Sequence, residues 1–392
     1  MKTYHDLPTP TAEAQKRSTA LHLIIEQQIQ AHHGKIPFSD FMQLALYHPM
    51  HGYYQQPTFA FGQQGDFTTA PELSPLFAQC FARQCQQIFE TLKQPTILEL
   101  GAGSGRFALD MLTKLESLGA LPDHYAIFEI SAGLRQKQLT LFQEMRPDLL
   151  PRITWLTALP TNISGIVIAN EVLDALPFAC FQIDDKKAYE RMVTMNDDDF
   201  SWELATPSSA ATQAAIEQLQ RDYALPDGYQ SEVHLPAMAL VRQLAEALSE
   251  GIILFADYGY GQREYYHPQR SQGSLSCFYQ HQLHDQPLLY PGLQDITAHV
   301  DFTRVIETAA DAGCQLSGFT TQSAFLLANG LLDEAQTIED TLTETEAFRL
   351  HQAIKVLTLP TEMGDRVKIM AISRNAEMPL TGFSMLDRRR DL

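Results

Sequence analysis

From Pro95 onward, short apolar runs rich in β-branched residues alternate with longer stretches of helical periodicity. Runs of this length, bounded by turn residues, are typical of strands that are buried on both faces. Buried strands that alternate with helices indicate an α/β fold built on a doubly wound parallel sheet. The seven runs occupy residues 96–100, 124–131, 152–156, 165–170, 251–259, 314–322 and 366–374.

The residues before this pattern are predominantly helical. Ser74 and Pro75 suit the start of a helix, and an apolar stripe at helical spacing follows them. We therefore expect a helical N-terminal region at 1–94 and a doubly wound domain at 95–392.

Two insertions are expected to interrupt the doubly wound domain. The first, at about 180–235, contains two alternating runs around an acidic turn, which predicts a β-hairpin. The second, at about 258–300, is irregular and rich in Tyr, His, Gln and Pro, and long segments of this kind are usually functional. Cys277, His281 and His284 have a loose metal-like spacing, but the usual zinc patterns need a second ligand pair, so we expect no metal.

Composition limits the classes of partner. The formal net charge is −19, which argues against DNA or RNA because nucleic-acid binders usually carry a basic face. The same charge is compatible with a cationic substrate and with solubility alone. No apolar run approaches the ~18 residues of a membrane helix, so we expect no membrane insertion. The N-terminus lacks a basic-then-apolar signal, which makes a cytoplasmic location the default expectation.

The turn after the first strand, "ELGAGSGR", is rich in glycine. Gly101, Gly103 and Gly105 allow positive φ and a close approach of the backbone to a ligand. A dinucleotide fingerprint needs a further glycine where this chain has Arg106, and the string from Glu99 instead reads E-x-G-x-G-x-G. The missing glycine weakens the case for NAD without excluding it.

Glu129 ends the second strand, downstream of this loop. An acid in this position can accept hydrogen bonds from both ribose hydroxyls of an adenosine, although a strand-end acid can also simply face water. Together, the glycine loop and Glu129 suit S-adenosylmethionine, which has no pyrophosphate.

With these blocks, the chain resembles the MidA-like family of class I methyltransferases, which includes the mitochondrial complex I assembly factor that methylates arginine. The resemblance covers most of the chain. Its most specific blocks are "GDFTTAPELSPLF" (65–77), "ANEVLDALPF" (169–178) and "PGLQDITAHVDF" (291–302). It implies a seven-stranded sheet with an antiparallel last strand, S-adenosylmethionine as cofactor, and the first block folded over the cofactor pocket.

The family therefore implies methylation of a protein side chain, with arginine as the leading acceptor and a respiratory complex subunit as a candidate partner. The alternative is an assembly factor that binds S-adenosylmethionine and acts mainly as a protein-binding module.

Asn170, Glu171 and Asp174 follow the fourth strand, which borders the cofactor cleft in such a sheet. If a helix begins there, Glu171 and Asp174 share one face. Carboxylates can hold a guanidinium bidentately and turn one nitrogen toward the methyl group. We expect Asn170 and Glu171 to face cofactor and substrate, with Asp174 in support. The alternative is that Asp174 caps a helix and Glu171 is a solvated first-turn acid.

"GDFTTAPE" supplies Asp66, Thr68 and Glu72, for which the resemblance favours a role in the cofactor lid. Glu72 would otherwise be a helix-start residue.

"QDITAHVDF" supplies Asp295, His299 and Asp301. A histidine flanked by acids can be a general base. More often such a group forms a structural hydrogen-bond network, in which Asp301 could cap the helix that follows.

Overall fold

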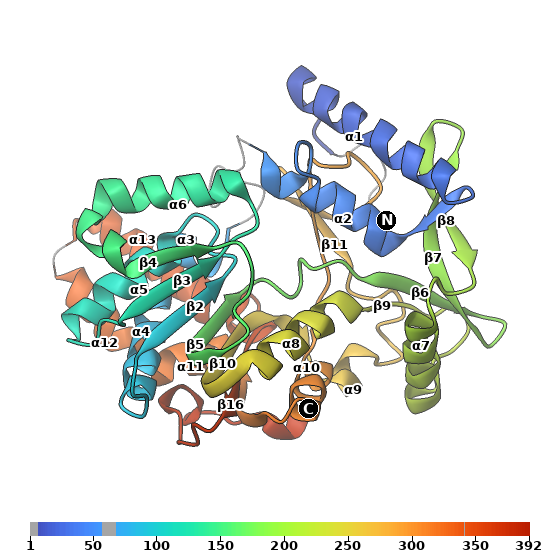
Figure 1. The fold of residues 1–392 in the computed structure, drawn as a ribbon. Helices are drawn as coiled ribbons and strands as arrows, with labels where there is room; N and C mark the ends of the chain where they lie inside the picture. Colours follow the sequence, from blue (N-terminus) through green and yellow to red (C-terminus); the bar gives the residue numbers. More distant parts are fainter. Residues whose placement is uncertain (1–6, 57–67, 341) are drawn as a thin grey trace. The chain divides into compact units, whose positions relative to one another are not determined.

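The computed structural model of the 392-residue chain describes residues 7–56, 68–340 and 342–392 (Figure 1). The chain forms two compact units, each assembled from segments that are distant in the sequence. Unit 1 comprises Met1–Phe67, Leu173–Leu240 and Gly261–Asp301, and unit 2 comprises Thr68–Val172, Val241–Tyr260 and Phe302–Leu392.

Unit 2 is built on a mixed sheet in which all seven expected strands form. In spatial order they are β15 (Gln315–Thr321), β16 (Val367–Arg374), β10 (Leu248–Tyr260), β5 (Ile163–Asn170), β2 (Thr96–Leu100), β3 (His124–Phe128) and β4 (Ile153–Leu156). On this path β16 alone runs opposite in direction to the other six strands. The expected class I methyltransferase sheet with an antiparallel last strand is confirmed.

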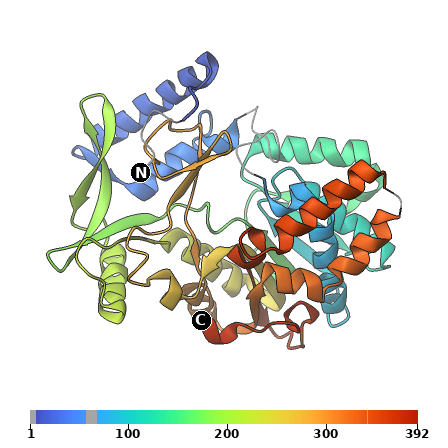
Figure 2. The same cartoon turned by 180° about the vertical axis from the view of Figure 1, so that it is seen from behind.

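Helices cover both faces of this sheet (Figures 1 and 2). They are α3 (Ala70–Leu73), α4 (Leu76–Phe89), α5 (Arg106–Ser117), α6 (Ala132–Met145), α10 (Phe302–Asp311), α11 (Gln322–Ala328), α12 (Leu331–Glu339), α13 (Glu344–Thr358) and α14 (Met363–Arg366), together with the C-terminal part of α8 (Leu235–Ala247). The apolar stripe of α4 faces the core, where Phe81 contacts the rings of Phe77, Phe107 and Phe325. Burying each such ring contributes about 1.5–3 kcal/mol.

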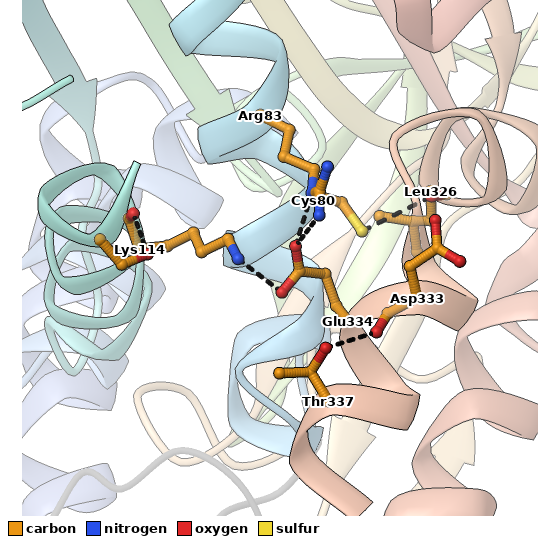
Figure 3. A network of polar contacts seen from close by, with 8 residues as sticks. Cys80, Arg83, Lys114, Leu326, Asp333, Glu334 and Thr337 are labelled. Carbon is orange, nitrogen blue, oxygen red and sulfur yellow. Dashed lines mark hydrogen bonds and ion pairs between the residues drawn. The ribbon is translucent and has the colours of Figure 1, made fainter. Parts of the chain in front are cut away.

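A buried carboxylate joins three helices at the edge of this core (Figure 3). Glu334 of α12 forms ion pairs with Arg83 of α4, at 2.5 Å, and with Lys114 of α5, at 2.6 Å. The Glu334 side chain is only 4% exposed, whereas that of Arg83 is 40% exposed. The Cys80 thiol, on the same helix as Arg83, lies 3.5 Å from the carbonyl oxygen of Leu326. The two ion pairs of Glu334 hold α12 against the α4–α5 pair, whereas the Cys80 contact joins α4 to α11.

Unit 1 contains a second sheet with the order β1-β7-β6-β9, in which β8 pairs with β7. β7 and β8 pair antiparallel on either side of a two-residue turn at Asp197 and Asp198, as expected of the predicted hairpin. A smaller sheet has the order β12-β11-β13. The elements are α1 (Ala12–Ala31), β1 (Lys35–Pro37), α2 (Phe38–Tyr47), β6 (Ala179–Asp184), β7 (Lys187–Asn196), β8 (Asp199–Ala205), α7 (Ala210–Tyr223), β9 (Gln230–Val233), α9 (Gln262–Tyr265), β11 (Ser276–Tyr279), β12 (Gln282–His284), β13 (Asp295–Thr297) and β14 (Val300–Asp301).

The two units cut across the boundary expected near residue 95. α4 belongs with the large sheet because its apolar face packs on α5, whereas β1 pairs with β7 of the first insertion. Within the described ranges, no helix has both the length and the apolar character needed to cross a bilayer.

Candidate active site

The glycine loop lies at the switch point of the large sheet. From β2 the chain proceeds to β3 and β4 on one side, and then returns to place β5 on the other side of β2. Ligands of open α/β sheets bind in the crevice beyond the carboxyl ends of the strands at such a point. The loop follows β2, and Asn170 ends β5, so both border this crevice.

The loop backbone needs its glycines. Gly101, Gly103 and Gly105 have φ values of 63°, 54° and 85°, in the left-handed region that costs other residues about 1–2 kcal/mol. A Cβ at Gly101 would stand 3.2 Å from Cγ2 of Val172, and one at Gly105 would stand 3.2 Å from Cγ of Gln138. Side chains at these positions would therefore strain the loop and press on its neighbours.

Glu129 is buried next to this loop. Its carboxylate accepts hydrogen bonds from the backbone N–H of Ser131, at 2.9 Å, and from Nε2 of Gln138, at 3.3 Å. Burial raises the pKa of Glu129, and the hydrogen bonds from Ser131, Gln138 and the Gly103 backbone act against that rise. Glu129 is thus an acid fixed by hydrogen bonds at the end of β3, beside the glycine loop. An acid in this position suits the ribose hydroxyls of an adenosine cofactor.

Gln138 is a residue that sequence reasoning missed. This fully buried side chain on α6 donates to the carbonyl oxygen of Gly103, at 2.9 Å, as well as to Glu129. Its own oxygen accepts from Nε1 of Trp155, at 2.9 Å. Gln138 therefore links the glycine loop, Glu129 and β4. The sequence signal that could have identified Gln138 is a polar residue at a position of α6 that faces the core.

Glu99 precedes the loop and is 4% exposed. Its carboxyl accepts a hydrogen bond from the Tyr125 hydroxyl, at 2.9 Å. The pKa of Glu99 is raised to about 8, chiefly by burial; the Tyr125 hydrogen bond acts against this rise, and the charge of Glu129 adds to it. Glu99 therefore carries a proton through much of the neutral range.

Replacing Glu99 with glutamine is expected to flatten the pH dependence of stability in the cofactor-free protein. Unfolding lowers the Glu99 pKa from about 8 to 4.5, so between these values the native state binds more protons and wild-type stability falls as pH rises. The variant should exceed the wild type at pH 8.5 by a few kcal/mol, since one pKa unit is worth about 1.4 kcal/mol. Urea unfolding from pH 5 to 8.5 tests this, and parallel curves would contradict it.

The described part of the "GDFTTAPE" block meets the glycine loop through Glu72 of α3. The Ser104 hydroxyl donates a hydrogen bond to the Glu72 carboxylate, and the Glu72 backbone N–H donates to the carbonyl oxygen of Thr69, at 3.1 Å. Thr68 is half-buried just before α3. Asp66 lies outside the described residues. Glu72 is thus both a helix-start residue and a contact of the loop.

Glu171 has an unusual backbone. Its φ is 51°, and its N–H donates to the carbonyl oxygen of Ala256 in β10, at 2.8 Å. Strained residues of this kind persist where the surroundings hold them, and they cluster at functional sites. No helix forms after β5, since bends and a turn follow. The expected shared helical face of Glu171 and Asp174 is therefore wrong, because the left-handed Glu171 redirects the chain.

The remaining predicted acids lie in unit 1. Asp174 is buried. The backbone N–H of Ala298 donates a hydrogen bond to the backbone carbonyl oxygen of Asp174, at 3.2 Å. Asp295 accepts from the Tyr54 hydroxyl, at 2.7 Å, and Asp301 accepts from Nε2 of Gln262, at 2.8 Å.

His299 also takes part in this buried packing through its backbone N–H, which donates to the Ser274 hydroxyl at 3.0 Å. These hydrogen bonds support the structural interpretation of the "QDITAHVDF" block. Among the described residues, no group of three histidines, cysteines or acids is placed to hold a metal ion.

A family model of S-adenosyl-L-methionine-dependent methyltransferases matches residues 80–320. The chain belongs to this methyltransferase family. A protein of Burkholderia thailandensis, whose crystal structure has S-adenosyl-homocysteine bound, is 37% identical to it. The alignment covers 99% of this chain and 100% of that one, with a TM-score of 0.92. This methyltransferase therefore uses S-adenosylmethionine, as expected, and the glycine cradle with the buried Glu129 fits that cofactor.

Two curated relatives extend the comparison. The protein arginine methyltransferase NDUFAF7 homolog, mitochondrial, of Drosophila melanogaster is 29% identical over 96% of this chain and 92% of its own length. Human protein arginine methyltransferase NDUFAF7, mitochondrial, is 28% identical over 86% of this chain and 80% of its own length. The expected cytoplasmic location is wrong by this comparison, because these relatives are named as mitochondrial. The expectation rested on a missing secretory signal, which reports on export alone.

Proposed function

We propose that this methyltransferase transfers a methyl group to an arginine side chain of a protein, with a respiratory complex subunit as the acceptor. The observation that carries the proposal is Glu171, an acid held in a strained conformation at the carboxyl end of β5, beside the glycine loop. The names of the curated relatives support both arginine and a mitochondrial setting.

The cofactor would be held by residues of unit 2. The backbone of Gly101, Gly103 and Gly105 would cradle it, and Glu129 would accept hydrogen bonds from the ribose hydroxyls. Glu99 lies at the start of this cradle, and Thr68 and Glu72 would close over it, with Asp66 as a further lid residue. When bound, S-adenosylmethionine supplies an electrophilic methyl group on a sulfonium.

Asn170 and Glu171 would orient the acceptor. A guanidinium is a poor nucleophile because its lone pairs are delocalised and it stays protonated. The Glu171 carboxylate would accept two of its N–H groups bidentately, localise the positive charge, and direct one nitrogen toward the methyl group. Asn170 would contact both cofactor and acceptor, and Asp174 would support this loop. Alignment and exclusion of water then supply most of the rate.

Incubation with isotope-labelled S-adenosylmethionine and cell extract, followed by mass spectrometry, tests the proposal. We expect label on arginine in a small number of proteins. Label confined to small molecules, or to lysine, would contradict it. A folded Glu171→Ala variant that still binds cofactor and supports biological function without transfer would favour the assembly-factor alternative.

A further inference from the structure

We propose that the open edge of β8 and the adjoining pocket of unit 1 bind an extended, basic segment of the acceptor protein by strand addition. This docking role rests on the proposed function, since the partner is the methyl acceptor. It adds a recognition surface within unit 1, built from the first insertion, α1 and residues 286–291 of the second insertion.

The register leaves one edge of β8 without a neighbouring strand. Asn196 and Asp199 pair across the two-residue turn of the hairpin, so they form a hydrogen-bonded pair, and such pairs alternate along the ladder. The backbone N–H and C=O groups of Phe200, Trp202 and Leu204 therefore point away from β7. Within the described ranges, β8 pairs with β7 alone, and no other backbone hydrogen bond reaches it. Such an edge is a template for an added strand.

A pocket of about 600 Å³ adjoins this edge. It is lined by residues 199–202 of β8, by Ser18, Thr19 and His22 among other residues of α1, and by residues 286–291 of the second insertion. Its volume falls within the range of about 300–1,000 Å³ that is typical of ligand sites. An open strand edge by itself does not imply a binding partner. An edge that lies beside a pocket also offers room for the side chains of an added strand.

The walls of the pocket are ordered by their own packing. The rings of His22 and Phe200 stack at 4.2 Å between centroids. The ring centroids of Trp202 and Phe38 are 5.0 Å apart, and the Arg191 guanidinium lies 4.2 Å from the centre of the Trp202 ring. Walls that are already fixed lower the ordering cost of binding.

The charge of this surface favours a basic segment. Asp197, Asp198 and Asp199 are exposed at the turn where β8 begins. The described lining of the pocket contains Asp199 and no lysine or arginine. A chain that presents arginine for methylation carries positive charge, so it complements this surface in sign.

Leu204→Pro tests strand addition. Leu204 is 38% exposed, and proline there removes an N–H that points away from β7, a position where edge strands tolerate proline. The probe is a capped, fluorescein-labelled ten-residue peptide of alternating arginine and valine. We expect its affinity to fall about tenfold in Leu204→Pro, for the lost hydrogen bond and the added bulk, and to change less than about twofold in Leu204→Ala. Equal affinities in the two variants would overturn the proposal.

A second variant covers the case in which the proline disturbs the hairpin. Asp197→Asn, Asp198→Asn and Asp199→Asn together should weaken the same peptide about tenfold at low salt. The matched control is Asp184→Asn with Asp185→Asn, which removes exposed acids at the β6–β7 turn and should leave affinity unchanged. A glutamate–valine peptide that binds as tightly as the arginine–valine peptide would overturn the assigned charge preference.

Labelling of cell extract separates this inference from the proposed function. At limiting extract, Leu204→Pro should label arginine about tenfold more slowly than wild type, through a higher KM. Equal labelling by both proteins overturns the docking role and leaves the proposed function intact. A wild type that labels no arginine, yet binds the peptide in a Leu204-dependent way, overturns the proposed function alone. Dimerisation of wild type that Leu204→Pro abolishes would identify a second copy as the occupant and overturn the proposal.

Discussion

Glu171→Gln is expected to lower kcat for methyl transfer by about 10²-fold or more while leaving the affinity for S-adenosyl-homocysteine unchanged. Each charge-assisted hydrogen bond to the guanidinium contributes about 1.5–3 kcal/mol, and a neutral amide cannot accept both or localise the charge. Two such bonds account for this loss in rate. Single-turnover transfer to the labelled acceptor and calorimetry with S-adenosyl-homocysteine measure the two quantities.

Glu171→Gly sharpens the same test. Glycine adopts the left-handed conformation of residue 171 without the cost of about 1–2 kcal/mol that an L-side chain bears there. We therefore expect a variant that is inactive and yet no less stable than the wild type. A purely structural role for Glu171 would produce the reverse, namely retained transfer or a loss of stability that parallels the loss of activity.

Glu334→Gln is expected to destabilise unit 2 by about 3–5 kcal/mol, because it leaves Arg83 and the largely buried Lys114 without their common counter-charge. Chemical unfolding followed by tryptophan fluorescence and circular dichroism measures the change. Replacing all three residues together with apolar side chains of similar size should cost less than the single change, since no charge then remains buried.

The matched control lies on the same helix. Glu339 of α12 pairs with His351 at 3.1 Å, and its side chain is 40% exposed. Glu339→Gln should change stability by less than about 1 kcal/mol, as for other exposed pairs of polar side chains. A loss as small as this in Glu334→Gln would mean that the ion pairs of Glu334 do not hold α12 in place.

The strands of the large sheet could be predicted from local sequence. The central strands β2, β5, β10 and β16 carry apolar runs that are almost wholly buried, and the turn residues that end the runs are local as well. The glycine loop was predictable for the same reason, since positive φ at Gly101, Gly103 and Gly105 is a property of the residues themselves.

Three-dimensional packing decided the features that depend on distant partners. α4 joins the large sheet and β1 joins the first insertion, because their apolar faces and backbone groups find partners far along the chain. Gln138 links Gly103, Glu129 and Trp155 only once α6 and β4 are folded together.

The stretch after β5 shows the division most clearly. Asn170 and Glu171 lie at the end of a buried strand, and this polar composition predicted a functional site from the sequence alone. Its backbone did not follow the helical spacing of Glu171 and Asp174, because the N–H of Glu171 is held by Ala256 of the neighbouring strand in a left-handed conformation. Residue type therefore determined which chemistry is present at this site, whereas the hydrogen bond between strands determined its geometry.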